Sequence, residues 1–421
     1  MKTFTFTLIL GLLSIFRAEA QRFTEHFVDK TLRVDYIFTG NAGHQHIALD
    51  GLSRLPSWAG RVSRLDELPL EGNGQVIVRE ADSKKCIYKT SFSSLFQEWL
   101  STDEAKTTDR AFENTFLIPY PVRPVEIEVV LFDANRKEAA SMKHIVRPDD
   151  ILIREKNANL VAPHKYLMRN GSQSKAIDVV LLAEGYTSEE TDMFYNDAQA
   201  ACESIFGHEP FQSMKDRFNV IAVAAPSADS GVSIPGRKLW KNTAVGSHFD
   251  TFYSDRYLTT NRVKAIHDVL AGIPYEHIVI LANTKQYGGG GIYNAFTLTT
   301  AHHPMFRPVV VHEFGHSFGG LGDEYFYEGE DVMSNMYPLT VEPWEPNITT
   351  LVSFDTKWKD MIEDNNSPVG LYEGGGYVSK GIYRPVDNCR MRTNECPGFC
   401  PVCRRAIERM INFYTEQENH D

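Results

Sequence analysis

The first third of the chain is dominated by short segments in which apolar and polar residues largely alternate. Leu32–Phe38, Gln75–Arg79 and Val125–Phe132 follow this pattern, which is typical of a strand with one buried face. Turn residues separate such segments, and several of them in succession are the signature of a small β-sandwich. We therefore expect an all-β, sandwich-like accessory domain over residues 21–150.

The pattern changes after about residue 150. Ala176–Ala183, Phe218–Ala225 and His277–Ala282 are nearly uninterrupted apolar runs, as expected for strands that are covered on both faces. Thr187–Glu190 combines a capping residue with acidic residues, which indicates the start of a helix. Buried strands that alternate with helices predict an α/β domain with a mostly parallel sheet over residues 151–421. The chain as a whole is thus predicted to be α+β.

The first twenty residues form a separate pattern. Lys2 precedes the apolar run Phe6–Phe16, and Ala18-Glu19-Ala20 supplies the small residues that signal peptidase accepts. We predict a signal peptide over residues 1–20 that is cleaved after Ala20. No later stretch has the length of a transmembrane segment, so the sequence predicts a secreted or periplasmic protein.

Composition narrows the possible partners. The chain has 421 residues, of which 42% are hydrophobic, and a formal net charge of −12. A chain of this composition can bury a large core. An acidic chain without a run of Lys and Arg is a poor match for nucleic acid, so no nucleic-acid partner is expected.

Four of the six cysteines crowd near the C-terminus, at Cys389, Cys396, Cys400 and Cys403. Export would place them in an oxidising compartment, which favours two disulfides. The same cluster could instead bind a structural zinc ion through tetrahedral thiolate ligands. The sequence leaves both alternatives open.

The strongest chemical signal is His312-Glu313-Phe314-Gly315-His316. Residues four apart lie on one face of a helix, so both imidazoles can reach one metal ion. Zinc lowers the pKa of a bound water, and a neighbouring carboxylate can accept the proton as the water attacks a carbonyl group. We predict that His312 and His316 bind one catalytic Zn²⁺ and that Glu313 is the general base.

A third ligand is expected shortly after this helix. If the helix continued, Asp323 would lie about 10 Å beyond His316 along the axis and could not share the metal. Gly319 and Gly320 allow the chain to leave the helix and turn back. Asp323 is therefore the favoured third ligand, with Glu324 or a carboxylate from a later helix as alternatives. Three protein ligands leave the open position that a catalytic zinc needs.

The run from 312 to 325, H-E-F-G-H-S-F-G-G-L-G-D-E-Y, resembles the extended zinc motif of the metzincin metallopeptidases. The chain is similar to the IgA-peptidase family of bacterial zinc metalloendopeptidases. The resemblance extends to three further segments, at 184–187, 287–293 and 383–403. It covers nearly all of the chain after residue 20. The chain departs from the metzincin pattern by one extra residue, because the acid stands eleven positions after His312 instead of ten.

The resemblance implies two further residues near the metal. A metzincin-like domain carries a methionine turn beneath the metal, which we assign to Met391, with Met336 as the alternative. A tyrosine can stabilise the oxyanion that forms on the attacked carbonyl group. Tyr383 is our candidate for this role, and Tyr325 is the alternative.

A glycine run at 288–291 precedes the predicted zinc helix. We expect Gly291–Thr300 to form an edge strand to which an extended peptide can add by backbone pairing. These features predict a zinc endopeptidase that acts on a protein or peptide, and the family name suggests immunoglobulin A. The alternatives are a zinc-containing binding or adhesion module without turnover and a metal-dependent hydrolase of non-protein amides. The presence of Glu313 argues against the first, because a structural zinc has no use for a neighbouring base.

Overall fold

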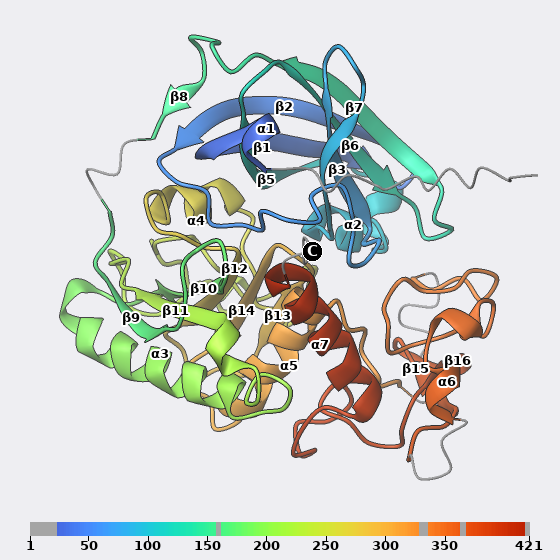
Figure 1. The fold of residues 1–421 in the computed structure, drawn as a ribbon. Coiled ribbons are helices and arrows are strands. Elements are labelled where there is room, and N and C mark those ends of the chain that lie inside the picture. Colours follow the sequence, from blue (N-terminus) through green and yellow to red (C-terminus); the bar gives the residue numbers. More distant parts are fainter. Residues whose placement is uncertain (1–22, 157–160, 328–335, 363–367, 417–421) are drawn as a thin grey trace, which may run out of the picture.

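The computed structural model describes residues 23–156, 161–327, 336–362 and 368–416. The predicted signal peptide, residues 1–20, lies outside these ranges. The β-sheets of the N-terminal half lie against a second half that contains a central sheet and most of the helices (Figure 1).

Two four-stranded sheets make up the N-terminal half, with strand orders β5-β1-β2-β8 and β4-β3-β6-β7. The three alternating segments of the sequence fall within β1, β3 and β6. The elements are α1 Phe23–His26, β1 Phe27–Asn41, β2 His44–Leu55, β3 Gly74–Glu80, β4 Cys86–Phe92, α2 Leu95–Trp99, β5 Arg110–Pro121, β6 Val125–Phe132, β7 Glu138–Val146 and β8 Arg154–Glu155.

The second half is built on a six-stranded sheet of order β13-β14-β12-β10-β11-β9. Its four inner strands are parallel and its two edge strands are antiparallel to their neighbours, so the mostly parallel sheet is confirmed. The elements are β9 His164–Arg169, β10 Ile177–Glu184, α3 Thr191–Phe206, β11 Phe218–Val223, α4 Val263–Val269, β12 His277–Ala282, β13 Gly289–Ile292, β14 Phe296–Thr300, α5 Phe306–Gly319, α6 Lys359–Ile362, β15 Tyr372–Gly375, β16 Val378–Arg384 and α7 Pro401–Thr415.

Strand β10 shows why the sequence has an uninterrupted apolar run there. All of its residues are buried. Val180 and Leu182 belong to a core cluster that includes α4 and the interior of the N-terminal half. Val179 and Leu181 belong to another cluster with residues of α3, α5 and α7. The N-terminal half therefore covers one face of the central sheet, and the helices cover the other face.

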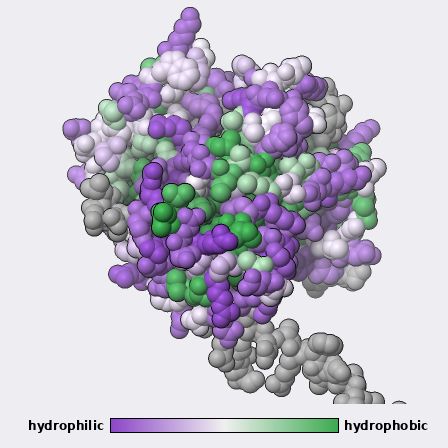
Figure 2. Space-filling view, turned by 90° about the horizontal axis from the view of Figure 1, so that it is seen from above, coloured by the Kyte–Doolittle hydropathy of each residue, from purple (hydrophilic) through white to green (hydrophobic). Residues whose placement is uncertain are grey.

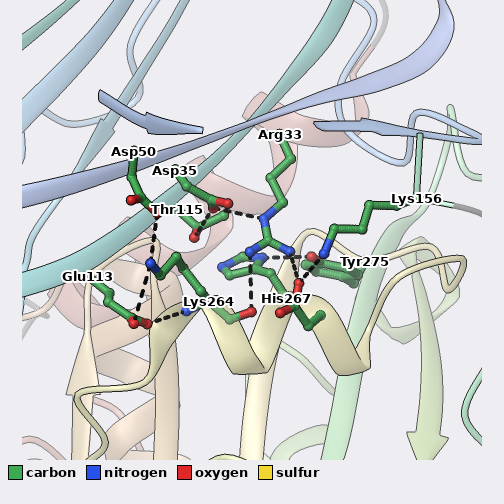
Figure 3. Close-up of polar contacts among 10 residues, drawn as sticks. Arg33, Asp35, Asp50, Glu113, Thr115, Lys156, Lys264, His267 and Tyr275 are labelled. Atoms are coloured by element: carbon green, nitrogen blue, oxygen red, sulfur yellow. Dashed lines mark hydrogen bonds and ion pairs between the residues drawn. The ribbon is translucent and has the colours of Figure 1, made fainter. Parts of the chain in front are cut away.

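A polar network reinforces the contact between the two halves (Figure 3). The guanidinium of Arg33 on β1 is buried and forms ion pairs with Asp35, at 2.8 Å, and with Asp268 on α4, at 2.6 Å. Lys156 pairs with the same Asp268 carboxylate at 2.6 Å, and Lys264 pairs with Asp50 at 2.7 Å. A charge as buried as that of Arg33 needs such partners, because desolvation without them is costly.

Seen from above in the view of Figure 1, on the side of the N-terminal half, the surface is mostly hydrophilic, and apolar residues gather near its middle (Figure 2). Exposed large apolar side chains of this half include Ile145, Ile151 and Leu152. Within the ranges that the structure describes, none of the helices combines the length and the apolar character that crossing a membrane requires.

The expected single strand Gly291–Thr300 is wrong in detail. The structure divides this region into β13 and β14, which form an antiparallel hairpin. Asn294 lies in the turn with φ at 51°, a left-handed conformation that asparagine tolerates better than most residues. Of these two strands only β13 lies at an edge of the sheet, because β14 lies between β13 and β12.

Candidate metal centre

Helix α5 carries His312, Glu313 and His316 on adjoining turns, as the local spacing predicts. The helix ends where Gly320 adopts a left-handed conformation, with φ at 61°. The amide of Gly320 donates to the carbonyl oxygen of His316 at 3.0 Å, which closes the last turn. Glycine accepts this conformation without steric cost, and the chain then turns back toward the two histidines.

The turn brings Asp323 between the two imidazoles. Its Oδ1 atom lies 3.2 Å from Nε2 of His312 and 3.2 Å from Nε2 of His316, and the two Nε2 atoms are 3.0 Å apart. Ligands of a tetrahedral zinc ion at 2.0–2.1 Å are separated by about 3.3 Å. Within the described residues, this buried Oδ1 has no hydrogen-bond partner. The three atoms thus suit a shared metal ion.

Backbone carbonyl groups set the orientation of both imidazoles. Nδ1 of His312 donates to the carbonyl oxygen of Arg390 at 2.9 Å. Nδ1 of His316 donates to the carbonyl oxygen of Leu321 at 2.6 Å. A proton fixed on Nδ1 leaves the lone pair on Nε2, and this is the usual way in which proteins orient histidine ligands.

Tyr377, just before β16, is a site residue that sequence reasoning missed. Its hydroxyl donates to Oδ2 of Asp323 at 2.5 Å, while the amide of Gly376 donates to the backbone carbonyl oxygen of Asp323 at 2.8 Å. Tyr377 follows Asp323 by 54 residues. No local pattern in the sequence distinguishes it from the other tyrosines, because only the fold brings it to the acid.

The charged groups of the centre shift one another's pKa. Burial would lower the pKa of His316, but the adjacent Asp323 carboxylate outweighs it and raises this pKa to about 9. Burial would raise the pKa of Asp323, whereas the two imidazoles lower it strongly. Burial raises the pKa of Glu313. Without a metal, His316 therefore carries a proton near neutral pH, and a metal ion would bind in competition with it.

Strand β13 approaches Glu313 closely because three of its four residues are glycine. A Cβ atom at Gly291 would lie 2.2 Å from the carbonyl oxygen of Glu313, and one at Gly289 would lie 2.9 Å from its Oε1 atom. A side chain at either position would collide with α5. The glycine run thus allows an edge strand to pass directly beside the carboxylate.

The N-terminal half also reaches this region, through α2. Tyr257 donates a short hydrogen bond to the Glu98 carboxylate. Burial raises the pKa of Glu98 to about 7, and the nearby negative charges of Glu313 and Asp323 act in the same direction. No local pattern pointed to Glu98, because it is separated from α5 by more than two hundred residues.

The remaining predicted residues have distinct positions. Met391 is fully buried, and its sulfur lies 2.8 Å from where a Cβ at Gly315 would be, so it packs against α5. Met336 is only partly buried. Tyr383 pairs through its backbone with Thr349, and its role as an oxyanion stabiliser stays a prediction.

Tyr325, the alternative oxyanion stabiliser, and Glu324, the alternative third ligand, also have contacts of their own. The ring of Tyr325 lies 5.3 Å from that of Tyr377. The carboxylate of Glu324 points to the cysteines, with Oε1 at 3.1 Å from Sγ of Cys403. The structure thus brings Asp323, and not Glu324, to the histidines.

A helix that presents two imidazoles and a carboxylate, followed by an acid beyond a glycine turn, resembles the arrangement found in hydrolytic metal centres. Comparison with protein families agrees with this class. A family model described as IgA Peptidase M64 matches residues 166–369 and 363–411, and a model described as Peptidase M64 N-terminus matches residues 22–143. The chain belongs to the IgA peptidase M64 family and is a metallopeptidase, a hydrolase that acts on peptide bonds. A search of curated proteins found no match.

Proposed function

We propose that the protein is an exported zinc endopeptidase in which His312, His316 and Asp323 bind the metal and Glu313 is the general base. The observation that carries the proposal is the convergence of two Nε2 atoms and Oδ1 of Asp323 within 3.0–3.2 Å of one another. Two nitrogen ligands and one carboxylate oxygen form a donor set that zinc accepts in hydrolytic enzymes.

Each residue of the centre has a separate role in the proposed reaction. Zinc, when bound, supplies a Lewis acid that activates water near neutral pH. Glu313 accepts the proton of the attacking water and can return it to the leaving amine. The carbonyl groups of Arg390 and Leu321 hold the two imidazoles in place, and the Tyr377 hydroxyl holds Asp323. We assign Met391 as the packing floor that a metzincin-like centre has below its metal.

The position of β13 supports internal cleavage. As an edge strand beside Glu313, β13 can pair with the backbone of an extended substrate on both sides of the bond that is cut. Its first residue, Gly289, already forms a bridge with Tyr257, so pairing starts beyond it. Backbone pairing does not require a free substrate terminus, which is why we propose an endopeptidase.

The test compares the wild type with Glu313→Gln on peptides blocked at both ends. We expect the variant to keep its metal and to lose about 10²–10⁴-fold in kcat, the range that a general base contributes. Glu408→Gln is the matched control, because Glu408 is an exposed residue on α7. Cleavage by Glu313→Gln at the wild-type rate would refute the assigned base. Cleavage restricted to peptides with free ends would refute the endopeptidase.

Substrate and location complete the proposal. The family description names IgA, so immunoglobulin A is the first protein to offer in the same assay. The predicted signal peptide supports export, and the exported protein should then begin at Gln21 by N-terminal sequencing. A product that still begins at Met1 would contradict this processing.

A further inference from the structure

A second cluster of side chains that could hold a metal ion lies next to the candidate metal centre. Glu324 follows Asp323 directly, Cys389 lies in the loop after β16, and Cys400 and Cys403 lie at the start of α7. One donor atom from each of these four residues lies within 4.8 Å of all the others. All four side chains are buried, and those of Glu324, Cys389 and Cys403 are buried completely.

The distances match metal ligation better than disulfide bonding. Sγ of Cys389 and Sγ of Cys403 are 3.8 Å apart, and Oε1 of Glu324 lies 3.1 Å from Sγ of Cys403. A disulfide requires about 2.05 Å between its sulfur atoms. Two thiolates bound at about 2.3 Å to a tetrahedral ion lie about 3.8 Å apart. The disulfides favoured by the sequence are not formed, since Cys389, Cys396, Cys400 and Cys403 are free thiols in the structure.

The surroundings of the cluster stabilise anionic ligands. The amide of Cys400 donates to Sγ of Cys389 at 3.3 Å, and the amide of Cys403 donates to Sγ of Cys400 at 3.4 Å. Nδ2 of Asn347 donates to Oε1 of Glu324 at 2.9 Å. Hydrogen bonds of this kind orient and stabilise metal-bound thiolates and carboxylates.

The other carboxylate oxygen of Glu324 has no donor to balance its charge among the described residues. Oε2 is buried and has no hydrogen-bond partner among the described residues. A buried carboxylate oxygen without a donor is unfavourable, and a cation can compensate for it.

The fourth cysteine of the sequence cluster stands apart. Cys396 is only partly buried, and its Sγ faces the carbonyl oxygen of Gly398 at 3.4 Å. Three thiolates and one carboxylate therefore converge on one point. Four protein ligands with no open position define a structural site, and sulfur-rich tetrahedral sites select zinc over magnesium or calcium.

We propose that Glu324, Cys389, Cys400 and Cys403 bind a second, structural zinc ion. This ion would tie the segment that carries Asp323 to the start of α7 and to the loop of Cys389. That loop continues into Arg390, whose carbonyl oxygen orients His312. It then reaches Met391, whose carbonyl oxygen accepts from the amide of Glu324 at 2.9 Å. The structural site thus fixes the floor of the catalytic one, but its ligands are separate from those of the proposed function.

The experiment measures metal content and the optical spectrum of the full chain after zinc is replaced by cobalt(II). Thiolate ligands produce an intense charge-transfer band in the near ultraviolet, whereas imidazole and carboxylate ligands do not. We expect two metal ions per chain and this band. The double variant His312→Ala/His316→Ala should keep one metal ion and the whole band, which separates this proposal from the proposed function.

Cys389→Ser should lose one metal ion and most of the band, whereas Cys396→Ser, the matched control, should lose neither. If Cys389→Ser fails to fold, the wild-type band and metal count decide. The proposal would be overturned by a wild type without the band, by iron instead of zinc at this site, or by an intact mass that is lower by two hydrogens for each disulfide.

Discussion

Asp323 and Glu324 are adjacent in the chain but belong to different clusters. Asp323 joins two imidazoles whose side chains are 13% and 15% exposed, so solvent still reaches these two side chains. Glu324 joins three buried sulfur atoms in an enclosed cluster. Donor type and exposure differ together: nitrogen and oxygen ligands with an open side suit catalysis, whereas sulfur ligands in a closed shell suit a structural role. Two neighbouring carboxylates can thus acquire different tasks from the direction in which the backbone presents them.

The largest expected effect comes from exchanging each acid for its amide. Asp323→Asn should reduce peptide cleavage by more than about 10²-fold and leave the cysteine cluster intact, because the loss of a ligand exceeds the 10–100-fold effect of a supporting residue. Glu324→Gln should mainly lower the melting temperature and the occupancy of the second site. Activity per folded molecule and metal content distinguish the two. Equal loss of cleavage in both variants would show that the clusters are not functionally separate.

A smaller effect is expected at Tyr377, which touches only the first cluster. Tyr377→Phe removes the hydrogen bond to Asp323 and should weaken metal binding by about 10–100-fold, with activity restored by added zinc. Tyr383→Phe on β16 is the companion variant. If Tyr383 stabilises the oxyanion, its replacement should lower kcat without changing metal affinity. Titration with a zinc chelator measures the metal affinity, and steady-state kinetics measure kcat. Unchanged metal affinity in Tyr377→Phe would contradict the idea that Tyr377 supports Asp323.

The smallest effect is expected at the turn that separates the two acids. Gly320→Ala forces a left-handed residue and places a Cβ 2.5 Å from Leu70, so we expect a loss of about 1–3 kcal/mol in unfolding free energy. Because this turn positions both Asp323 and Glu324, metal binding should weaken at both clusters together. Gly319→Ala is the control within the helix, and urea denaturation compares the two. Weakening at one cluster alone would show that the turn does not set both.

Sequence reasoning worked best where structure is local. The spacing of His312 and His316 is fixed by one helix, and the glycines after it indicated a turn toward Asp323. The strands β1, β3 and β6 followed from alternation, and β10 from its uninterrupted apolar run. In each case a few neighbouring residues carry the whole signal, because helix and strand periods are properties of short segments.

The rest depended on contacts between distant segments. Tyr377, Glu98 and the carbonyl of Arg390 reach the centre only through tertiary packing, so no local pattern could reveal them. The cysteines posed a different difficulty, because four of them near one another fit either disulfides or a metal. The fourth member of the proposed metal site is Glu324, which is far from the cysteines in sequence and lies beside them only in the fold.

The core that the two halves share has a consequence for attempts to separate them. Apolar residues of the N-terminal sheets and one face of the central sheet form a single cluster, and buried Arg33 bridges the same boundary. Expressing either half alone would expose a large apolar surface to solvent. The segments that the two family models match therefore share one hydrophobic core, and we expect them to unfold together.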